Sequence, residues 1–499
     1  MDLHYPAGQC CEATDLLHLE NVVVVNLHWL DFAEDAFDSL IKGRKLKVLT
    51  LVHNRSIHGT PTFPKYSVLE RLTIYGCCHL MEIDCSIGNL RWLTDLSVES
   101  CAALRKLPEQ IGELRKLRHL SLMSCQNLVE LPDSVSKLVS LTMLDVSCTR
   151  ITRLPDSISS LPYPSSLDVS FTLIAGMPST MSKFLHLQRL YMDRCNWIRE
   201  LPMLPTSLTV LWLRSTLLFT IPNLSYLTNL VELLLSDDTE TTRTSNVFQT
   251  CDLRWIGRLS KLSKLHFCFL NGCAPATELD SLSLLKELTL YGLDLQTLEQ
   301  LPSNSLEKVT VKRNDFKTLA IPSNLTKRKE SKGDDCHEQF EDKTLGAFKS
   351  MKRPRIEDCK FLEGLVCQSE ELRHNEQQAS QLTYGWRGAF LIPSSLNMLR
   401  EFHLSKCPEV RDIQFVSALE SLEEFSVSRC ISLKRLGGLS KVKNLKQLHI
   451  EWCENLQVVE GIYKLKFLHK LKIHECRSMR RIFDALRSKI PKECSIEIS

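Results

Sequence analysis

Apolar residues recur along this chain with a fixed spacing, most clearly between Leu93 and Pro155. Each unit has the order L-x-x-L-x-L-x-x-C/T, followed by further apolar residues and Leu-Pro. Successive units begin at Leu93, Leu117 and Leu141, which gives a period of 24 residues. Neighbouring residues of a strand point to opposite sides, so the leucines of L-x-x-L-x-L share one side and the residues between them share the other. Each unit therefore predicts one short strand that is buried on one side.

Units with the same phase cover most of the chain. Eighteen of them begin at Val22, Leu46, Leu69, Leu93, Leu117, Leu141, Pro164, Leu187, Leu208, Leu230, Leu262, Leu285, Leu306, Met351, Leu399, Leu422, Leu445 and Leu468, the one at Met351 being degenerate. One such strand cannot bury its apolar side alone, whereas parallel strands stacked in a row form a continuous core. The period and pattern fall within the leucine-rich-repeat consensus. They predict an α/β, horseshoe-shaped solenoid with a parallel sheet on its concave side.

The second half of many units carries two apolar residues three positions apart. The pairs are Ile111 and Leu114, Val135 and Leu138, Ile158 and Leu161, and Met181 and Phe184. This spacing predicts a single helical or 3-10 turn on the convex side. Proline followed by aspartate, as at Pro132-Asp133, suits the start of such a turn.

Cysteine recurs at one position of the unit, where other repeats use asparagine. These residues are Cys77, Cys101, Cys125, Cys195, Cys359, Cys407, Cys430, Cys453 and Cys476. Zinc or redox chemistry would need thiols that converge on one point, and evenly spaced single thiols do not converge. We therefore interpret this cysteine column as small buried side chains whose S–H groups meet the backbone, reduced as in a cytoplasmic or nuclear protein.

Polar stretches divide the chain. We expect a lead-in over 1–18, a first stack of repeats over 19–323, an irregular charged insertion with one degenerate repeat over 324–390, and a C-terminal stack and cap over 391–499. A smaller polar insertion runs from Ser236 to Arg258. The basic run Lys349–Arg355 fits either a nuclear-localisation signal or a degenerate strand with its basic residues facing solvent, and we favour the strand.

Composition and motifs give no indication of an enzyme. The formal charge of +3 gives no reason to expect nucleic acid or a membrane as the partner. The first residues resemble no signal peptide, and no apolar stretch is long enough for a membrane-spanning helix. Phosphate-loop, dinucleotide-binding, zinc-protease and nucleophile-elbow motifs are missing, so we expect no catalytic residue, no cofactor and no metal. The histidines near Glu451 and Glu475 could be imagined around a metal, but we interpret them as solvated.

The exposed strand positions on the concave side are the candidate binding surface. They differ from unit to unit while the leucines do not, which suits recognition on a rigid scaffold. Tyrosine, tryptophan and arginine often dominate protein–protein binding energy, although some aromatics only pack on their neighbours. The predicted partner-binding residues are Arg189, Tyr191, Arg194, Trp212, Arg214, His449, Glu451, Trp452, His469, Lys472 and His474. From Lys441 to Arg481, ten Lys or Arg stand against four Glu, so this end should attract an acidic partner.

Two runs of sequence, Leu107–Leu117 and Leu131–Leu141, resemble the repeat region of plant intracellular nucleotide-binding leucine-rich-repeat immune receptors. The recurrent L-x-L-x-x-C-x-x-L-x-x-L-P is typical of the class with an N-terminal Toll/interleukin-receptor domain, and Leu19–Leu27 is similar to that class's early repeats. The resemblance covers about 20–499 and lacks the N-terminal and nucleotide-binding domains. It implies the recognition half of such a protein, which binds a pathogen effector, a host guard target or a nucleotide-binding signalling domain in the cytoplasm or nucleus. The oligomeric state stays open.

One alternative is a leucine-rich-repeat scaffold that serves as a substrate adaptor of a ubiquitin-ligase type complex. That function would need an F-box-like helical segment ahead of the repeats, where about twenty residues stand. The sequence therefore favours recognition over the adaptor.

Overall fold

The computed structural model describes residues 2–4, 21–28, 41, 43–215, 221–236, 253–268, 279, 281–291, 305–312, 318–321, 352–357, 364–367, 389–392, 398–415, 417–479, 490–491 and 493–498. The chain divides into two compact units, Met1–Thr242 and Arg243–Ser499. Each unit is described by itself.

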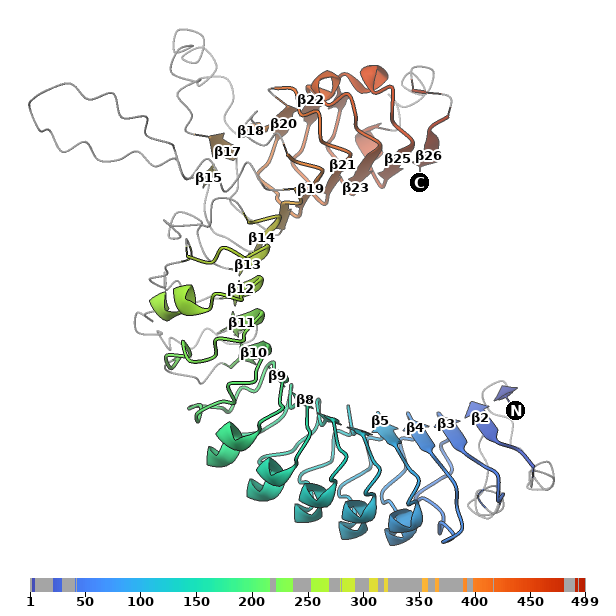
Figure 1. The fold of residues 1–499 in the computed structure, drawn as a ribbon. Coiled ribbons are helices and arrows are strands. Elements are labelled where there is room, and N and C mark those ends of the chain that lie inside the picture. Colours follow the sequence, from blue (N-terminus) through green and yellow to red (C-terminus); the bar gives the residue numbers. More distant parts are fainter. Residues whose placement is uncertain are drawn as a thin grey trace, which may run out of the picture. The chain divides into compact units, whose positions relative to one another are not determined.

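The first unit is a stack of parallel strands, each paired with the next along the chain (Figure 1). Most strands open two residues after a predicted unit start, so the predicted phase is confirmed. The strands are β1 (Asp2–His4), β2 (Val24–His28), β3 (Val48–Val52), β4 (Arg71–Tyr75), β5 (Asp95–Glu99), β6 (His119–Ser121), β7 (Met143–Asp145), β8 (Ser166–Asp168), β9 (Arg189–Met192), β10 (Val210–Arg214) and β11 (Glu232–Ser236).

The second unit contains a sheet of the same kind. Its strands are β12 (Lys264–Cys268), β13 (Glu287–Tyr291), β14 (Lys308–Lys312), β16 (Arg355–Glu357), β19 (Glu401–Ser405), β21 (Glu424–Ser428), β23 (Gln447–Glu451), β25 (Lys470–His474) and β26 (Ser495–Ile498). The degenerate repeat is part of the ladder, because Arg355 pairs in register with Thr310 on one side and with His403 on the other. Of the described residues of this basic run, Arg355 lies in β16, so the strand interpretation is confirmed for Arg355.

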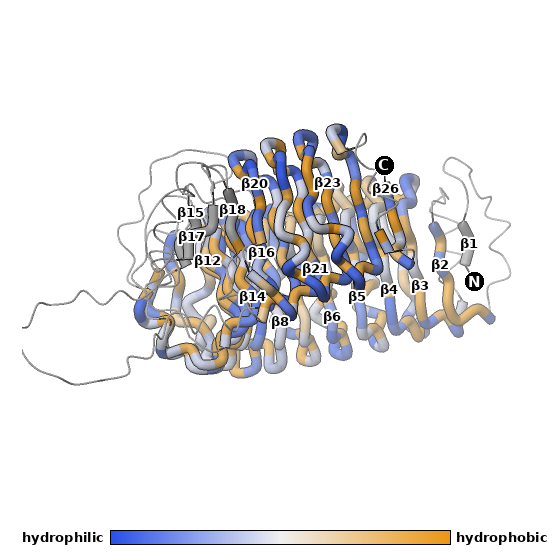
Figure 2. Tube along the Cα trace, turned by 90° about the horizontal axis from the view of Figure 1, so that it is seen from above, coloured by the Kyte–Doolittle hydropathy of each residue, from blue (hydrophilic) through white to orange (hydrophobic). Residues whose placement is uncertain are grey.

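Burial alternates along the strands as the pattern predicts. In β3 to β5 the leucines Leu49, Leu72 and Leu96 are 0–1% exposed, whereas the strand residues next to them are at least partly exposed. Figure 2 shows the same alternation as changes of hydropathy along the tube. Burying one leucine side chain contributes about 2 kcal/mol, so the repeated leucines form a core that runs along each stack.

Short 3-10 turns lie on the side of the first unit opposite the strands (Figure 1). They are η2 (Cys85–Asn89), η3 (Glu109–Glu113), η4 (Asp133–Lys137), η5 (Asp156–Ser160) and η6 (Ser179–Lys183). The four predicted apolar pairs close η3 to η6, as where the Leu114 N–H donates to the Ile111 carbonyl at 3.2 Å. Pro132, with φ −68° and ψ 149°, is the N-cap residue and makes no side-chain capping bond, and Asp133 lies in the first turn.

The second unit differs on this opposite side. It carries the short turns η7 (Arg254–Arg258), η11 (Leu439–Lys441), η12 (Ile462–Lys464) and η13 (Arg477–Met479), and also further parallel strands that the sequence analysis did not predict. Those strands are the pair β15 (Thr318–Ile321) and β17 (Gly364–Cys367), and the sheet β18 (Ala389–Ile392), β20 (Asp412–Phe415), β22 (Arg435–Gly437) and β24 (Val458–Val459). In β20 the buried Ile413 and Phe415 alternate with partly exposed residues, which is a strand pattern.

The cysteine column has the structural role that its spacing indicated. Seven of its described members are fully buried and Cys476 is 3% exposed, while Cys359 lies outside the described residues. The Cys125 and Cys195 thiols donate to the carbonyls of Val98 and Val169, each at 3.1 Å. Thr149 and Thr172 hold the same position and donate hydroxyl hydrogen bonds of 2.7 Å. The column therefore satisfies backbone carbonyls between successive turns.

A left-handed residue precedes the cysteine position in most units with a described turn. Ten of these residues are not glycine, and their φ values lie between 50° and 62°: His53, Ser100, Ser124, Cys148, Phe171, Arg194, Lys406, Arg429, Trp452 and Glu475. Gly76 occupies the same position with φ 68°. The feature was not predictable from the sequence pattern, because asparagine and glycine, the usual residues for that conformation, are nearly absent at this position.

Most of the predicted insertion lies outside the described residues. Of the segment 324–390, only 352–357, 364–367 and 389–390 are described, and of the lead-in only 2–4. The polar insertion between β11 and β12 lies outside the described residues from 237 to 252. The predicted domain boundaries at 323/324 and 390/391 stay predictions.

Candidate functional site

Register aligns the strand residues that alternate with the buried leucines of the first unit into rows that cross the sheet. We call the residues at the second position after each unit start the first row, and those at the fourth position the second row. The first row includes Arg71, Asp95, His119, Met143, Ser166 and Arg189, and the second row includes Ser121, Asp145, Asp168, Tyr191 and Trp212. Neighbours in a row stand about 4.8 Å apart at the backbone, so their side chains contact each other.

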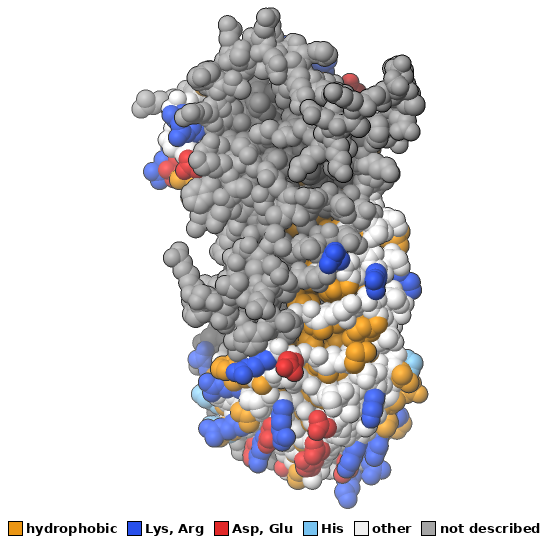
Figure 3. Space-filling view, turned by 90° about the vertical axis from the view of Figure 1, so that its left-hand side faces the viewer, with side chains coloured by type: hydrophobic (Ala, Val, Ile, Leu, Met, Phe, Trp, Pro, Cys, Tyr) orange, Lys and Arg blue, Asp and Glu red, His pale blue; other side chains and the backbone are white. Residues whose placement is uncertain are grey.

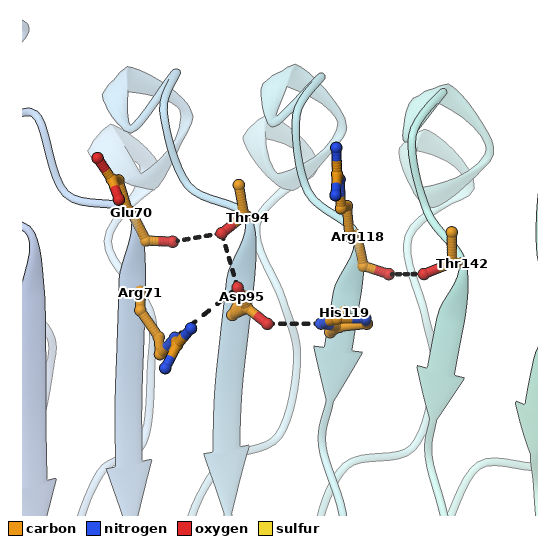
Figure 4. Close-up of polar contacts among 7 residues, drawn as sticks. All are labelled: Glu70, Arg71, Thr94, Asp95, Arg118, His119 and Thr142. Carbon is orange, nitrogen blue, oxygen red and sulfur yellow. Dashed lines mark hydrogen bonds and ion pairs between the residues drawn. The ribbon is translucent and has the colours of Figure 1, made fainter.

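A charged cluster occupies the first row across β4, β5 and β6 (Figure 4). Asp95 accepts a hydrogen bond of 2.6 Å from the Thr94 hydroxyl, lies 2.5 Å from His119 Nδ1 and lies 3.8 Å from Arg71 Nε. Burial alone would raise the pKa of Asp95, but the hydrogen bonds from Thr94 and His119 and the attraction of Arg71 outweigh it and lower that pKa. Thr94 also donates to the Glu70 carbonyl at 3.0 Å, as Thr142 does to that of Arg118, which fixes one repeat against the next.

Tyr191 and Trp212 form an aromatic pair in the second row. Their rings meet edge to face with centroids 5.1 Å apart, and the two residues are aligned in register on β9 and β10. The Trp212 indole N–H donates to Glu232 Oε1 at 2.8 Å. Both side chains are partly exposed, so they present one rigid aromatic surface to solvent.

The three predicted arginines of this unit have different surroundings. Arg214 Nε lies 2.8 Å from Asp193 Oδ1, and both side chains are more than four-fifths buried. The Arg194 guanidinium stands over the Phe171 ring, 5.5 Å from its centroid. Arg189 is in register with Ser166. The five predicted residues of the first unit thus lie together on β9 and β10 or directly after β9.

Two carboxylates that the sequence analysis did not select stand beside the aromatic pair. Asp145 and Asp168 are aligned in register on β7 and β8, and Asp168 is aligned with Tyr191. The Asp168 pKa is raised by burial and by the negative charges of Asp145 and Asp193, against the lowering effect of hydrogen bonds from Ser170. Both residues stand at the same position of the repeat as Tyr191 and Trp212, and this shared position was the feature of the sequence that could have identified them.

The predicted residues of the second unit lie on β23, β25 and the turn after β23, with one exception. Lys472 Nζ pairs with Glu451 Oε1 at 2.8 Å, and Trp452 meets His474 edge to face at 5.3 Å. His449 Nδ1 lies 3.9 Å from Glu424 Oε1. His469 is exposed one residue before β25, where its backbone N–H donates to the Lys446 carbonyl. The other five therefore form the cluster, and His469 stands apart from it.

Ion pairs across strands balance many charges of the second unit. Lys446 pairs with Glu423 at 3.0 Å and Lys470 with Glu497 at 3.3 Å. His403 lies 4.0 Å from both Glu401 and Glu424, and its pKa is lowered by burial and by Arg355 despite these carboxylates. Part of the positive excess over Lys441–Arg481 is thus already neutralised within the unit, and attraction of an acidic partner to this end stays a prediction.

Within the described ranges, no group of three or more His, Cys, Asp or Glu side chains is arranged to hold a metal ion. No helix there is long and apolar enough to cross a membrane. On the side of the molecule that Figure 3 shows, acidic and basic side chains are interspersed at the lower end.

Comparison with known proteins gives a family match over part of the chain. Residues 369–489 match the family model for the leucine-rich repeats of plant disease resistance proteins similar to RPS2. No curated protein sequence matches the chain.

Solved structures show the fold. A leucine-rich-repeat protein of Leptospira interrogans is 18% identical with a TM-score of 0.50, over 97% of this chain and 98% of that one. The structure of the Drosophila Toll–Spätzle complex is 14% identical with a TM-score of 0.52, over 95% of this chain and 61% of that one. The TLR13–ssRNA13 complex gives 16% identity and a TM-score of 0.51, over 99% of this chain and 83% of that one. At these identities the likeness establishes the architecture, a leucine-rich-repeat solenoid, and not the ligand.

Proposed function

We propose that this leucine-rich-repeat solenoid is the recognition module of a plant disease-resistance protein and binds another protein through the exposed side of its sheet. The match of residues 369–489 to the repeats of plant disease resistance proteins carries the proposal. It agrees with the sequence resemblance, which extends the proposal to the Toll/interleukin-receptor class and to a place of action in the cytoplasm or nucleus. The partner would be a pathogen effector, a host protein or a signalling domain.

The arrangement of side chains supports a protein as the ligand. Tyr191–Trp212 in the first unit and Trp452–His474 in the second are rigid edge-to-face pairs that are partly exposed. Aromatic side chains of this kind provide large contact area at low cost in conformational entropy, which is why they often dominate binding energy. The Toll–Spätzle complex, described as a hub in development and innate immunity, is a protein complex on the same architecture.

Nucleic acid is a poorer fit, although TLR13 was solved with ssRNA13. Binding of a phosphate backbone needs clustered Lys and Arg without nearby carboxylates. Here Asp145 and Asp168 occupy the second row of the sheet, and Lys472 in the other unit is paired with Glu451. These carboxylates would repel phosphates.

Affinity capture from infected and uninfected plant tissue tests the proposal. The full chain is compared with two triple variants of matched composition. The surface variant carries Tyr191→Ala, Trp212→Ala and Trp452→Ala. The control variant carries Tyr463→Ala, Trp92→Ala and Trp197→Ala, whose side chains are 52–57% exposed away from the exposed strand positions.

A protein that the wild type and the control capture, and that the surface variant loses about tenfold or more, supports the proposal, because hot-spot aromatics each contribute about 2 kcal/mol or more. Equal capture by all three proteins would show that the exposed side of the sheet is not the binding surface. Co-purification of ubiquitin-ligase subunits in place of an immune partner would support the adaptor function.

A further inference from the structure

Asp145 and Asp168 place two like charges opposite each other on neighbouring strands. Asp145 Oδ1 accepts hydrogen bonds from the Ser147 N–H at 2.8 Å and from the Ser147 hydroxyl at 2.6 Å, and Asp168 Oδ1 accepts one from the Ser170 N–H at 2.8 Å. Each carboxylate thus uses one oxygen locally, and within the described ranges neither has an ion pair. Like charges directly opposite on a sheet destabilise the fold.

Two other aspartates of the first unit are paired with a cation from a neighbouring strand. Asp95 stands between Arg71 and His119, and Asp193 is paired with Arg214 at 2.8 Å. The arrangement at Asp145 and Asp168 therefore differs from that at Asp95 and Asp193. Residues that lower stability without a structural benefit are typical of binding sites.

The surroundings of the two carboxylates suit a planar cation. Asp168 is in register with Tyr191, whose ring meets Trp212 edge to face, so an aromatic surface begins one strand away. The neighbouring Ser147, Ser166 and Ser170 are small and buried, and the two carboxylates are partly exposed. A guanidinium group binds carboxylates through several N–H groups and also stacks on aromatic rings, whereas an ammonium group does neither as well.

We propose that Asp145 and Asp168 receive an arginine side chain of the partner protein, whose guanidinium bridges the two carboxylates and lies against Tyr191. The inference rests on the proposed function, since it specifies the partner's chemistry at the same surface. Nearby charges agree with it. Asp145, Asp168 and Asp193 are three negative charges against Arg189 and Arg214, and Arg214 is already paired with Asp193. A partner cation would also relieve the repulsion that raises the Asp168 pKa.

The test uses a fluorescein-labelled hexa-arginine peptide and the full chain, with fluorescence anisotropy at fixed ionic strength. Hexa-lysine and hexa-glutamate peptides serve as comparison probes. The site variant is Asp145→Asn with Asp168→Asn, because asparagine keeps the oxygen that accepts from Ser147 and Ser170. The matched control is Asp133→Asn with Asp156→Asn, which removes the same charge from exposed residues of η4 and η5.

We expect hexa-arginine to bind more tightly than hexa-lysine and the site variant to bind it about tenfold more weakly, as for loss of one charged hydrogen-bonded contact. The control variant should keep wild-type affinity. Equal weakening in both variants would mean diffuse attraction to a negative surface and would overturn the inference. The same conclusion follows if the wild type binds no hexa-arginine, or binds hexa-lysine or hexa-glutamate equally well.

Thermal unfolding of the same variants separates recognition from a structural role. The site variant should melt at a higher temperature than the wild type at neutral pH, because it removes the repulsion between the two carboxylates. A lower melting temperature would mean that the pair stabilises the fold, which would contradict the inference.

The inference and the proposed function can fail separately. If hexa-arginine does not bind but the aromatic triple variant still loses a captured protein, the proposed function holds and only the arginine contact is wrong.

Discussion

At the scale of single residues, the effect of a carboxylate on the stability of this sheet depends on the residue that the register places beside it. Asp95 has Arg71 and His119 as neighbours, and its pKa is lowered. Asp168 has Asp145 as a neighbour, is more buried, and has a raised pKa. Chemically equal side chains therefore act on stability with opposite sign.

Replacing Asp95 with asparagine should lower the free energy of unfolding at pH 7 by about 1 kcal/mol, the range of partly exposed ion pairs. The pKa of Asp95 is lowered, so its contribution is present above the ordinary carboxyl pKa of 3.8 and is lost as the pH falls through the lower folded value. Urea denaturation of both proteins at pH 7 and near pH 3 measures this difference.

The two proteins should converge at the acid end. Glu130→Gln is the control, since this exposed carboxylate has no ion pair among the described residues. A pH-independent difference between Asp95→Asn and wild type would mean that the hydrogen bond from Thr94, and not the charge, stabilises the fold.

The cysteine column should be chemically inert. Burial raises the pKa of Cys195 and of Cys453 to about 12, so the reactive thiolate at pH 8 is about ten-thousandfold less abundant than the thiol. Iodoacetamide labelling with peptide mapping should modify the exposed Cys78 and Cys85 and leave Cys195 and Cys453 unmodified until urea is added. Rapid labelling of Cys195 in the native protein would contradict the structural role.

At the scale of elements, glycine is required at particular turns and is replaceable elsewhere. Gly438 caps η11 with φ 74°, and a Cβ atom there would lie 2.3 Å from the Phe415 carbonyl oxygen. Gly176 has nothing within 4 Å of the corresponding position. The same substitution should therefore have different consequences at the two sites.

We expect Gly438→Ala to lower the free energy of unfolding by about 2 kcal/mol or more, because it combines an unfavourable left-handed conformation with a clash against backbone. Gly176→Ala should change it by less than about 1 kcal/mol in either direction. Urea titrations of the two variants decide this, and equal losses would mean that the turn at Gly438 can rearrange.

The strands of the sheets were predictable because one leucine phase marks each of them. The eighteen predicted unit starts correspond to β2 through β14, β16, β19, β21, β23 and β25. β26 was missed because Glu493 stands where the phase requires an apolar residue. β1 was missed because Asp2 is aligned with Asn26, four residues after the start of its unit, so the corresponding start of the β1 unit falls before Met1. The additional strands around β20 were missed because Ile413 and Phe415 lie in the second half of the repeat. In the first unit that half forms a 3-10 turn, so no strand was predicted there.

The candidate surface was predictable only in part. Residue type alone was enough to select Tyr191 and Trp212, and register then confirmed that they meet. Asp145 and Asp168 were missed because the meaning of a carboxylate depends on its cross-strand neighbour. His469 was selected for its residue type, but it lies one residue outside the strand.

At the scale of the whole molecule, each repeat depends mainly on its neighbours. Stability in such stacks is approximately a sum of repeat and neighbour terms, so a local defect should have a local effect. Leu120 in β6 is 1% exposed and is in register with Leu96 and Leu144. It is thus a central core residue of the first unit.

Leu120→Ala should cost about 2–5 kcal/mol locally. Hydrogen exchange followed by mass spectrometry should become faster in peptides from β5, β6 and β7 and change progressively less toward β2 and β10. Uniform acceleration throughout the first unit would show that it unfolds as one cooperative body instead.

The pairing of β14, β16 and β19 has a wider consequence. Lys312 is aligned with Glu357, and Glu357 with Ser405, although more than forty residues separate each pair along the chain. Pairing in this ladder depends on the order of the strands and not on the length of chain between them. A segment of foreign sequence, such as a reporter domain, could therefore be spliced between two strands here while the adjoining repeats keep their register. The same property makes such a chain tolerant of duplication and exchange of whole repeats, with each new copy adding one more set of exposed side chains.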